Sequence, residues 1–135
     1  MKLKTPYGSE EITKVRINQY QNNGNIAIQL YCKDEELGFE EPYDMLTVNF
    51  EGLPPFTGFV NVNNVPGIEE FIKENNLGEK VEGYEARTNF VTYPLYSFNE
   101  EKLKELDKDG FDKYAAWCLE NIEIEDEEFD EEPEV

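Results

Sequence analysis

The stretch Val15-Arg16-Ile17-Asn18-Gln19-Tyr20-Gln21-Asn22-Asn23-Gly24-Asn25-Ile26-Ala27-Ile28-Gln29-Leu30-Tyr31-Cys32-Lys33 decides the fold. Side chains alternate with a period of two over residues 15–20 and again over residues 26–33, which is typical of strands with one buried face. Asn23-Gly24 lies between the two runs and favours a type I′ turn, because both central residues of that turn need a positive φ. The stretch therefore predicts a β-hairpin.

Further strands are predicted on both sides of this hairpin, because short runs rich in β-branched and aromatic residues are bounded there by turn residues. They are residues 2–7, 45–50, 57–62, 81–86 and 90–98. The last is unusually aromatic and contains Pro94. Proline cannot donate to a strand ladder, so we predict that this strand lies at a sheet edge or is bulged.

Three helices are predicted in the second half of the chain. Asn64 is placed to cap the first, with Pro66 in its first turn and Gly78 at its end. Asn99 caps the second, which ends at residues 107–110, and apolar residues at helical spacing follow over residues 111–119.

These elements predict an α+β fold, with an antiparallel sheet of five to six strands and two to three helices packed on it. A chain of 135 residues has the size of one domain and buries enough surface for a real core. We predict one domain at residues 1–121 and an acidic, disordered C-terminal tail at residues 122–135, because a block of like charges stays solvated.

Charge is the most unusual property of the sequence, with 31 acidic and 12 basic residues and a net charge of −19. Residues 1–119 hold 21 acidic and all 12 basic residues, and the last sixteen hold ten acidic residues and no basic one. This excess argues against binding to nucleic acids and to anionic membranes, which both need Lys and Arg. A partner that is chosen by charge is a basic protein.

The sequence predicts a cytoplasmic protein. No apolar run approaches the length of a membrane span, and the N-terminus has no apolar segment of the kind a signal peptide carries. The two cysteines, Cys32 and Cys118, fit no metal or redox spacing, and we expect both to be reduced and buried.

Most catalytic machinery is excluded by composition. The chain has no histidine, which removes Ser-His-Asp and Cys-His catalysis and the common histidine metal sites. It has no glycine-rich nucleotide loop. We therefore predict no catalytic residues, no cofactor and no metal, and a protein that is not an enzyme.

The acidic turn around Gly110 is the one candidate for calcium. Aligned on this glycine, Glu105, Asp107 and Asp109 occupy the first three ligand positions of an EF-hand. The position that needs a bidentate carboxylate is Ala116, so the motif fails and a helix-to-helix turn is favoured.

Several stretches resemble a family of bacterial proteins that is catalogued only as a domain of unknown function. They are Glu41-Pro42-Tyr43-Asp44-Met45-Leu46-Thr47-Val48-Asn49-Phe50, Asn63-Asn64-Val65-Pro66-Gly67-Ile68-Glu69-Glu70-Phe71-Ile72, Asn75-Asn76-Leu77-Gly78, Phe90, and Tyr93-Pro94-Leu95-Tyr96-Ser97-Phe98. The resemblance covers roughly residues 1–98 and is carried by structural motifs. It implies the context of plasmids, phages and conjugative elements, and it transfers no activity or site residue.

Charge and resemblance together predict a non-enzymatic protein-binding module of a mobile genetic element. Its predicted role is inhibition of a host defence nuclease or another nucleic-acid-binding protein, by DNA-like charge or by blocking its site. The predicted binding residues are the carboxylates Glu120, Glu123, Glu125, Asp126, Glu127 and Glu128, with Tyr93 and Tyr96 as anchors.

Three alternatives stay open on the sequence. One is an accessory protein of conjugation or replication that binds a basic partner without inhibiting it. Another is an enzyme that uses carboxylates alone with Mg²⁺. The last is a toxin-neutralising protein, which an exposed hydrophobic patch would favour over charge mimicry.

Overall fold

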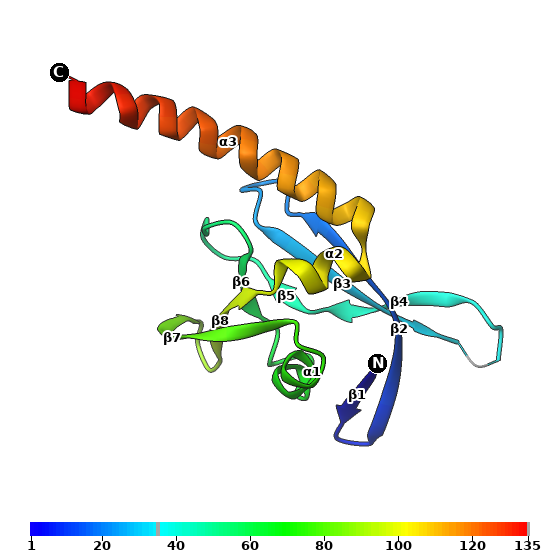
Figure 1. Ribbon diagram of the computed structural model, residues 1–135. Helices are drawn as coiled ribbons and strands as arrows, with labels where there is room; N and C mark the ends of the chain where they lie inside the picture. Colours follow the sequence, from blue (N-terminus) through cyan, green and yellow to red (C-terminus); the bar gives the residue numbers. More distant parts are fainter. Residues whose placement is uncertain (35, 135) are drawn as a thin grey trace.

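The computed structural model describes the backbone of residues 1–34 and 36–134, and the side chains of residues 1–34 and 36–121. Within this part of the chain, eight strands form two four-stranded antiparallel sheets, accompanied by three helices (Figure 1). The predicted α+β class is confirmed. The prediction of one sheet of five to six strands was only partly right, because the strands divide between two sheets.

The first sheet has the order β1-β2-β3-β4 and contains the predicted hairpin. Its strands are β1 (Lys2–Thr5), β2 (Gly8–Gln19), β3 (Ile26–Lys33) and β4 (Glu40–Met45). Val15 lies opposite Leu30 and Ile17 opposite Ile28, so the apolar faces of the two long strands coincide. This register confirms the hairpin that the alternation of side chains predicted.

The hairpin turn differs from the predicted type I′ turn. Residues 20–25 form the loop, and only Gly24 in it has a positive φ, of 75°. The Gly24 N–H donates to the Tyr20 carbonyl, and the Asn23 side chain accepts from the Asn25 N–H. A longer loop with one left-handed residue therefore replaces the two-residue turn.

The second sheet has the order β5-β6-β8-β7. Its strands are β5 (Thr47–Val48), β6 (Thr57–Val60), β7 (Gly78–Arg87) and β8 (Thr92–Phe98). The strand that contains Pro94 is β8, which lies inside the sheet, so its predicted edge position was wrong. Pro94 pairs with Glu85 of β7 and lies beyond the pairs that β8 forms with β6. The irregularity that proline predicts is found instead as a register shift of β7.

The helices are α1 (Ile68–Glu74), α2 (Glu100–Leu106) and α3 (Lys108–Glu134). Asn99 caps α2 as predicted, since its side chain accepts from the Lys102 N–H. Asn64 does not cap α1, because turns at residues 61–68 separate it from the helix and Gly67 takes the N-cap position.

The predicted domain boundary at residue 121 falls within α3. The backbone of residues 122–134, within the predicted tail, continues α3. The division into a domain and a disordered tail stays a prediction.

One hydrophobic core joins the two sheets and the helices. Its fully buried members include Leu3, Ile17, Ile28, Leu46, Ile68, Phe71, Ile72, Leu77 and Leu103. Helix α3 crosses the end of the β2–β3 hairpin (Figure 1) and adds Tyr114 and Cys118 to the core. Both cysteines are free and buried, as predicted.

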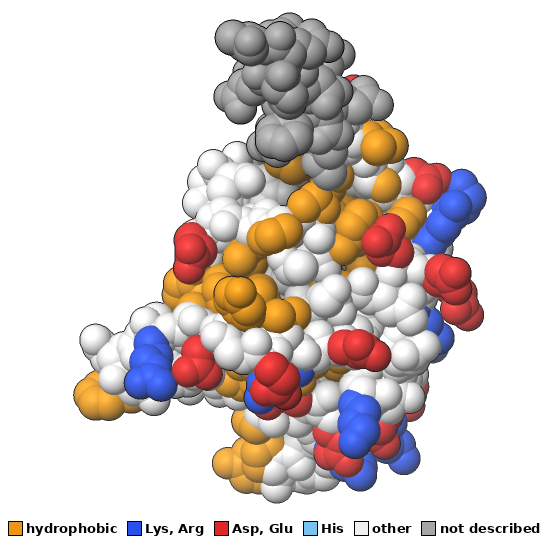
Figure 2. Space-filling model, turned by 60° about the vertical axis from the view of Figure 1, so that its left-hand side comes forward, with side chains coloured by type: hydrophobic (Ala, Val, Ile, Leu, Met, Phe, Trp, Pro, Cys, Tyr) orange, Lys and Arg blue, Asp and Glu red, His pale blue; other side chains and the backbone are white. Residues whose placement is uncertain are grey.

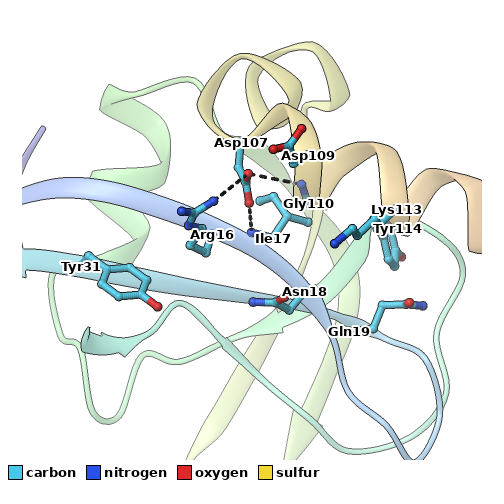
Figure 3. Close-up of a pocket in the computed structure, with 10 residues that line it drawn as sticks. All are labelled: Arg16, Ile17, Asn18, Gln19, Tyr31, Asp107, Asp109, Gly110, Lys113 and Tyr114. Carbon is cyan, nitrogen blue, oxygen red and sulfur yellow. Dashed lines mark hydrogen bonds and ion pairs between the residues drawn. The ribbon is translucent and has the colours of Figure 1, made fainter. Parts of the chain in front are cut away.

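The carboxylate of Asp107 fastens the junction of α2 and α3 to β2 (Figure 3). It accepts from the Ile17 N–H at 2.8 Å, from the Gly110 N–H at 3.2 Å and from the Arg16 guanidinium at 3.4 Å. Its side chain is only 6% exposed. The acidic turn that the sequence suggested as a calcium candidate therefore serves to hold the helices on the sheet.

Replacing Asp107 by Ala leaves the amides of Ile17 and Gly110 without an acceptor. We expect Asp107→Ala to lower the free energy of unfolding by about 2–4 kcal/mol, because buried polar groups then lack partners. Urea denaturation followed by tryptophan fluorescence measures this loss. The exposed neighbour Asp109 is the matched control, and Asp109→Ala is expected to change stability by less than about 0.5 kcal/mol. Equal losses for the two variants would contradict the role of Asp107.

Candidate functional site

A polar hollow of about 450 Å³ lies beside the Asp107 carboxylate, between β2 and the start of α3 (Figure 3). Arg16, Asn18, Gln19, Asp109 and Lys113 contribute its polar groups. Its buried acid already takes hydrogen bonds from two backbone amides and the neighbouring arginine. The hollow is explained by the attachment of α3 to the sheet.

The segment between β5 and β6, named here the ridge, is tied by hydrogen bonds to the hairpin loop and to α3. Asn25, buried just after the hairpin turn, donates through its side-chain amide to the Glu51 carbonyl at 2.7 Å and accepts from the Leu53 N–H at 2.9 Å. At the far end, the Phe56 N–H donates to the Tyr114 hydroxyl at 3.0 Å. These bonds hold Leu53 and the prolines beside it, Pro54 and Pro55, in a fixed position at the surface.

The first of two hollows on this ridge, named here the bulge hollow, lies between the ridge and β7. It has a volume of about 470 Å³, and the buried side chains of Phe59 and Leu95 are part of its lining. Leu53 and Pro54 line it from the ridge, and Val81 and Tyr84 line it from β7. The carboxylate-bearing residues Glu51 and Glu85 complete its lining, together with Gly52 and Thr57.

The second hollow, named here the tryptophan hollow, lies between the ridge and α3 and has a volume of about 350 Å³. Trp117, Tyr114, Cys118 and Asn121 line it from the helix. Gly24 lies so close to the indole ring that a Cβ at this position would overlap it. Burial raises the pKa of the Cys118 thiol, so the sulfur is kept protonated and unreactive at neutral pH.

Both hollows share Gly52, Leu53 and Pro54, so they form one continuous surface. Phe50 extends it, with its ring 5.8 Å from that of Phe59 and 5.2 Å from that of Tyr93. Figure 2 shows hydrophobic side chains gathered in the middle of one face, with acidic and basic side chains interspersed around them. The name aromatic surface is used below for Phe50, Leu53, Pro54, Pro55, Tyr84, Tyr93 and Trp117.

The predicted site residues divide between this surface and other places. Tyr93 lies half-buried against Phe50, within the aromatic surface. Tyr96 is buried, and its hydroxyl donates to the Glu69 carboxylate at 2.6 Å, so its ring is not exposed for an anchor role. Glu120 is exposed on α3, just after Trp117. The other predicted carboxylates, Glu123, Glu125, Asp126, Glu127 and Glu128, lie outside the residues whose side chains are described.

Sequence reasoning missed the residues that make the surface continuous. Residues 52–55 lie between two predicted strands and received no role, and Trp117 lies within the run at residues 111–119 that was predicted only as a helix. The available signal was the combination of two adjacent prolines with a single tryptophan, since exposed tryptophan is enriched in interfaces. Their proximity depends on pairing between distant strands, which no local pattern encodes.

Among the described residues, no three His, Cys, Asp or Glu side chains are grouped so that they would hold a metal ion. No helix in that part of the chain combines the length and the apolar character needed to cross a membrane.

Comparison with known proteins places the chain in a family. Residues 14–117 match the family described as Domain of unknown function (DUF4313), and the chain belongs to it. This confirms that the chain is a member of a family of unknown function and extends the matched region beyond residue 98. No curated protein and no solved structure was found to match the chain.

Trp117 is the one tryptophan of the chain, so its fluorescence reports on the tryptophan hollow. We expect Gly24→Ala to shift the emission maximum to longer wavelength, because the new methyl group displaces the indole ring toward water. The positive φ of Gly24 and the overlap together are expected to cost about 1–3 kcal/mol of stability. Gly52→Ala is the matched control, since a Cβ there meets no atom within 4 Å. An unchanged spectrum for Gly24→Ala would place the indole elsewhere.

Two buried tyrosines make stability depend on alkaline pH. Burial and the hydrogen bond to Glu69 raise the pKa of Tyr96, and burial raises the pKa of Tyr114. The folded state therefore holds these protons after the unfolded chain has released them near pH 10. The stabilisation that these two protonated hydroxyls contribute to the folded state is complete below about pH 10 and is lost as the pH rises further.

Urea unfolding between about pH 9 and 11 measures this loss, which is expected to be smaller in a Tyr96→Phe and Tyr114→Phe double variant. Tyr7→Phe, at a fully exposed position, is the control and should follow the wild type. If the double variant loses stability as steeply as the wild type, the two hydroxyls are not responsible.

Proposed function

Because the family carries no assigned activity, we propose from the site itself that this protein is a non-enzymatic protein-binding module. The observation that carries the proposal is the aromatic surface, where a mostly apolar hollow and a second hollow of mixed polarity flank the ridge. Trp117 is 38% exposed and Tyr84 is 64% exposed, although burial would stabilise both. Exposed aromatic side chains beside preformed hollows are typical of protein-protein interfaces.

The charge of the chain selects the partner. A net charge of −19 attracts a basic protein and raises the rate of association. The most specific role we propose is inhibition of a nucleic-acid-binding protein, such as a host defence nuclease, in the context of a mobile genetic element. Proteins that bind nucleic acids expose the basic surfaces that such a charge attracts.

Between DNA-like charge and site blocking, the described surface favours blocking by direct contact. Six of the basic side chains form ion pairs with acidic side chains of the folded part, which breaks up any regular array of carboxylates. The apolar hollows supply buried area, and buried apolar area stabilises a complex more than exposed ion pairs do. In this proposal the aromatic surface holds the partner and the acidic residues steer it.

Capture from bacterial lysate on the immobilised full-length protein tests the proposal. The wild type is expected to retain basic, nucleic-acid-binding proteins at low salt. A Leu53→Gln and Tyr84→Ala double variant is expected to lose at least about tenfold of that capture, because it removes apolar contacts from the ridge and from β7. Tyr7→Ala truncates a fully exposed aromatic ring in the turn between β1 and β2 and should capture as the wild type does.

A second variant separates contact from steering. It carries Gln or Asn in place of Glu123, Glu125, Asp126, Glu127 and Glu128, and we expect slower association with capture preserved at low salt. Undiminished capture by the Leu53→Gln and Tyr84→Ala variant would contradict the proposed contact surface. Complete loss of capture by the tail variant would favour charge mimicry instead.

A further inference from the structure

We propose that the bulge hollow is a recognition pocket for one lysine or arginine side chain of the partner protein. This inference rests on the proposed function and deepens it, because it names the chemistry that the partner must present. It follows from three properties of the hollow, which are its apolar lining, its two carboxylates and the exposed ring of Tyr84.

The lining of the hollow suits the stem of a long cationic side chain. Phe59 and Leu95 are 3% and 7% exposed, so they offer an apolar base. Leu53 and Pro54 lie on one side and Val81 on the other. The methylene groups of lysine and arginine pack against such apolar surface while their charged ends stay near water.

The charged residues that line the hollow are both acidic, and one of them, Glu85, is paired with Arg87 outside the lining. Glu51 and Glu85 are its only ionisable carboxylates, and no Lys or Arg is among its described lining residues. The exposed ring of Tyr84 adds a face that attracts cations. A neutral side chain would gain from the apolar base alone, whereas a cation gains from all three.

Glu85 already binds a guanidinium, which shows that its carboxylate is accessible to one. Its oxygen lies 3.2 Å from the Arg87 guanidinium, and the two side chains are 46% and 76% exposed. An exposed pair of this kind contributes little to stability. A cation from the partner can therefore share or replace Arg87 at small cost.

An irregularity of β7 brings the tyrosine to the hollow. Lys80 pairs with Tyr96 and Glu85 pairs with Pro94, so the segment from Val81 to Tyr84 bulges opposite a single residue of β8. Gly83 permits the bulge with a φ of 84°. Bulges of this kind redirect side chains at functional sites.

The tryptophan hollow offers an internal comparison. It is of similar size and shares the ridge, yet its described lining contains no Asp or Glu. A cation therefore has charged partners in the bulge hollow and none in its neighbour. We expect the two hollows to differ in what they accept, with cationic side chains confined to the first.

Two capped pentapeptides of glycine and alanine, which differ only in a central lysine or norleucine, test the pocket. Both are titrated into the full-length protein, and amide nitrogen–proton NMR correlation spectra are recorded. The lysine peptide is expected to cause saturable shifts at Val81, Tyr84 and Leu95, with an affinity at least about tenfold above that of norleucine. Glu51→Gln with Glu85→Gln should remove this preference.

Glu79→Gln is the matched control, since Glu79 is an exposed acid on the same strand but does not line the hollow. Equal binding of the two peptides, or shifts that avoid the hollow, would overturn the inference. So would a preference for lysine that survives the Glu51→Gln and Glu85→Gln changes.

The two proposals fail in different ways. If the Glu51→Gln and Glu85→Gln double variant still captures the partner as the wild type does, the cation pocket is wrong while the binding module stands. If the Leu53→Gln and Tyr84→Ala variant captures fully, the proposed contact surface is wrong, whatever the peptides show.

Discussion

The buried carboxylate of Asp107 is the constraint on which the position of α3 depends. It binds the backbone of β2 through the Ile17 N–H and the first turn of α3 through the Gly110 N–H. Gly110 itself has no room for a Cβ, because the Asp107 carboxylate and the Ile17 carbonyl lie against it. This attachment directs α3 across the hairpin, where Trp117 meets Gly24 and closes one side of a hollow. A residue used only for structure therefore determines the shape of the proposed binding face.

The ridge at residues 52–55 depends on a second buried polar residue, Asn25. Its side chain bonds to the backbone on both sides of Gly52, and a buried amide would be costly to leave unpaired. Asn25 follows the hairpin turn directly, so the same few residues fix the turn, the ridge and the position of the Trp117 side chain. The two hollows are consequently coupled through the ridge, and a partner that fills one contacts a wall of the other.

How much of the fold and of the candidate site could be predicted from the sequence depends on how far apart the interacting residues lie along the chain. The hairpin and the Asn99 cap follow from neighbouring residues, and both are confirmed. Asn64 had the right residue type for a cap, but the turns after it moved the helix start to Ile68. Pro94 correctly indicated an irregular strand pair, although its partner β7 carries the bulge. The division into two sheets and the meeting of Leu53, Tyr84 and Trp117 depend on contacts between distant segments, which local patterns do not determine.

The acidic composition and the aromatic surface are better explained together than apart. Exposed apolar hollows normally invite self-association, because two copies can bury them against each other. A net charge of −19 opposes that pairing, since two identical chains repel at every approach. On the proposed function, the same charge would attract a basic partner. In the proposed function, charge would therefore disfavour pairing of two copies through the aromatic surface and favour a basic partner there, and neither property alone would give this selectivity.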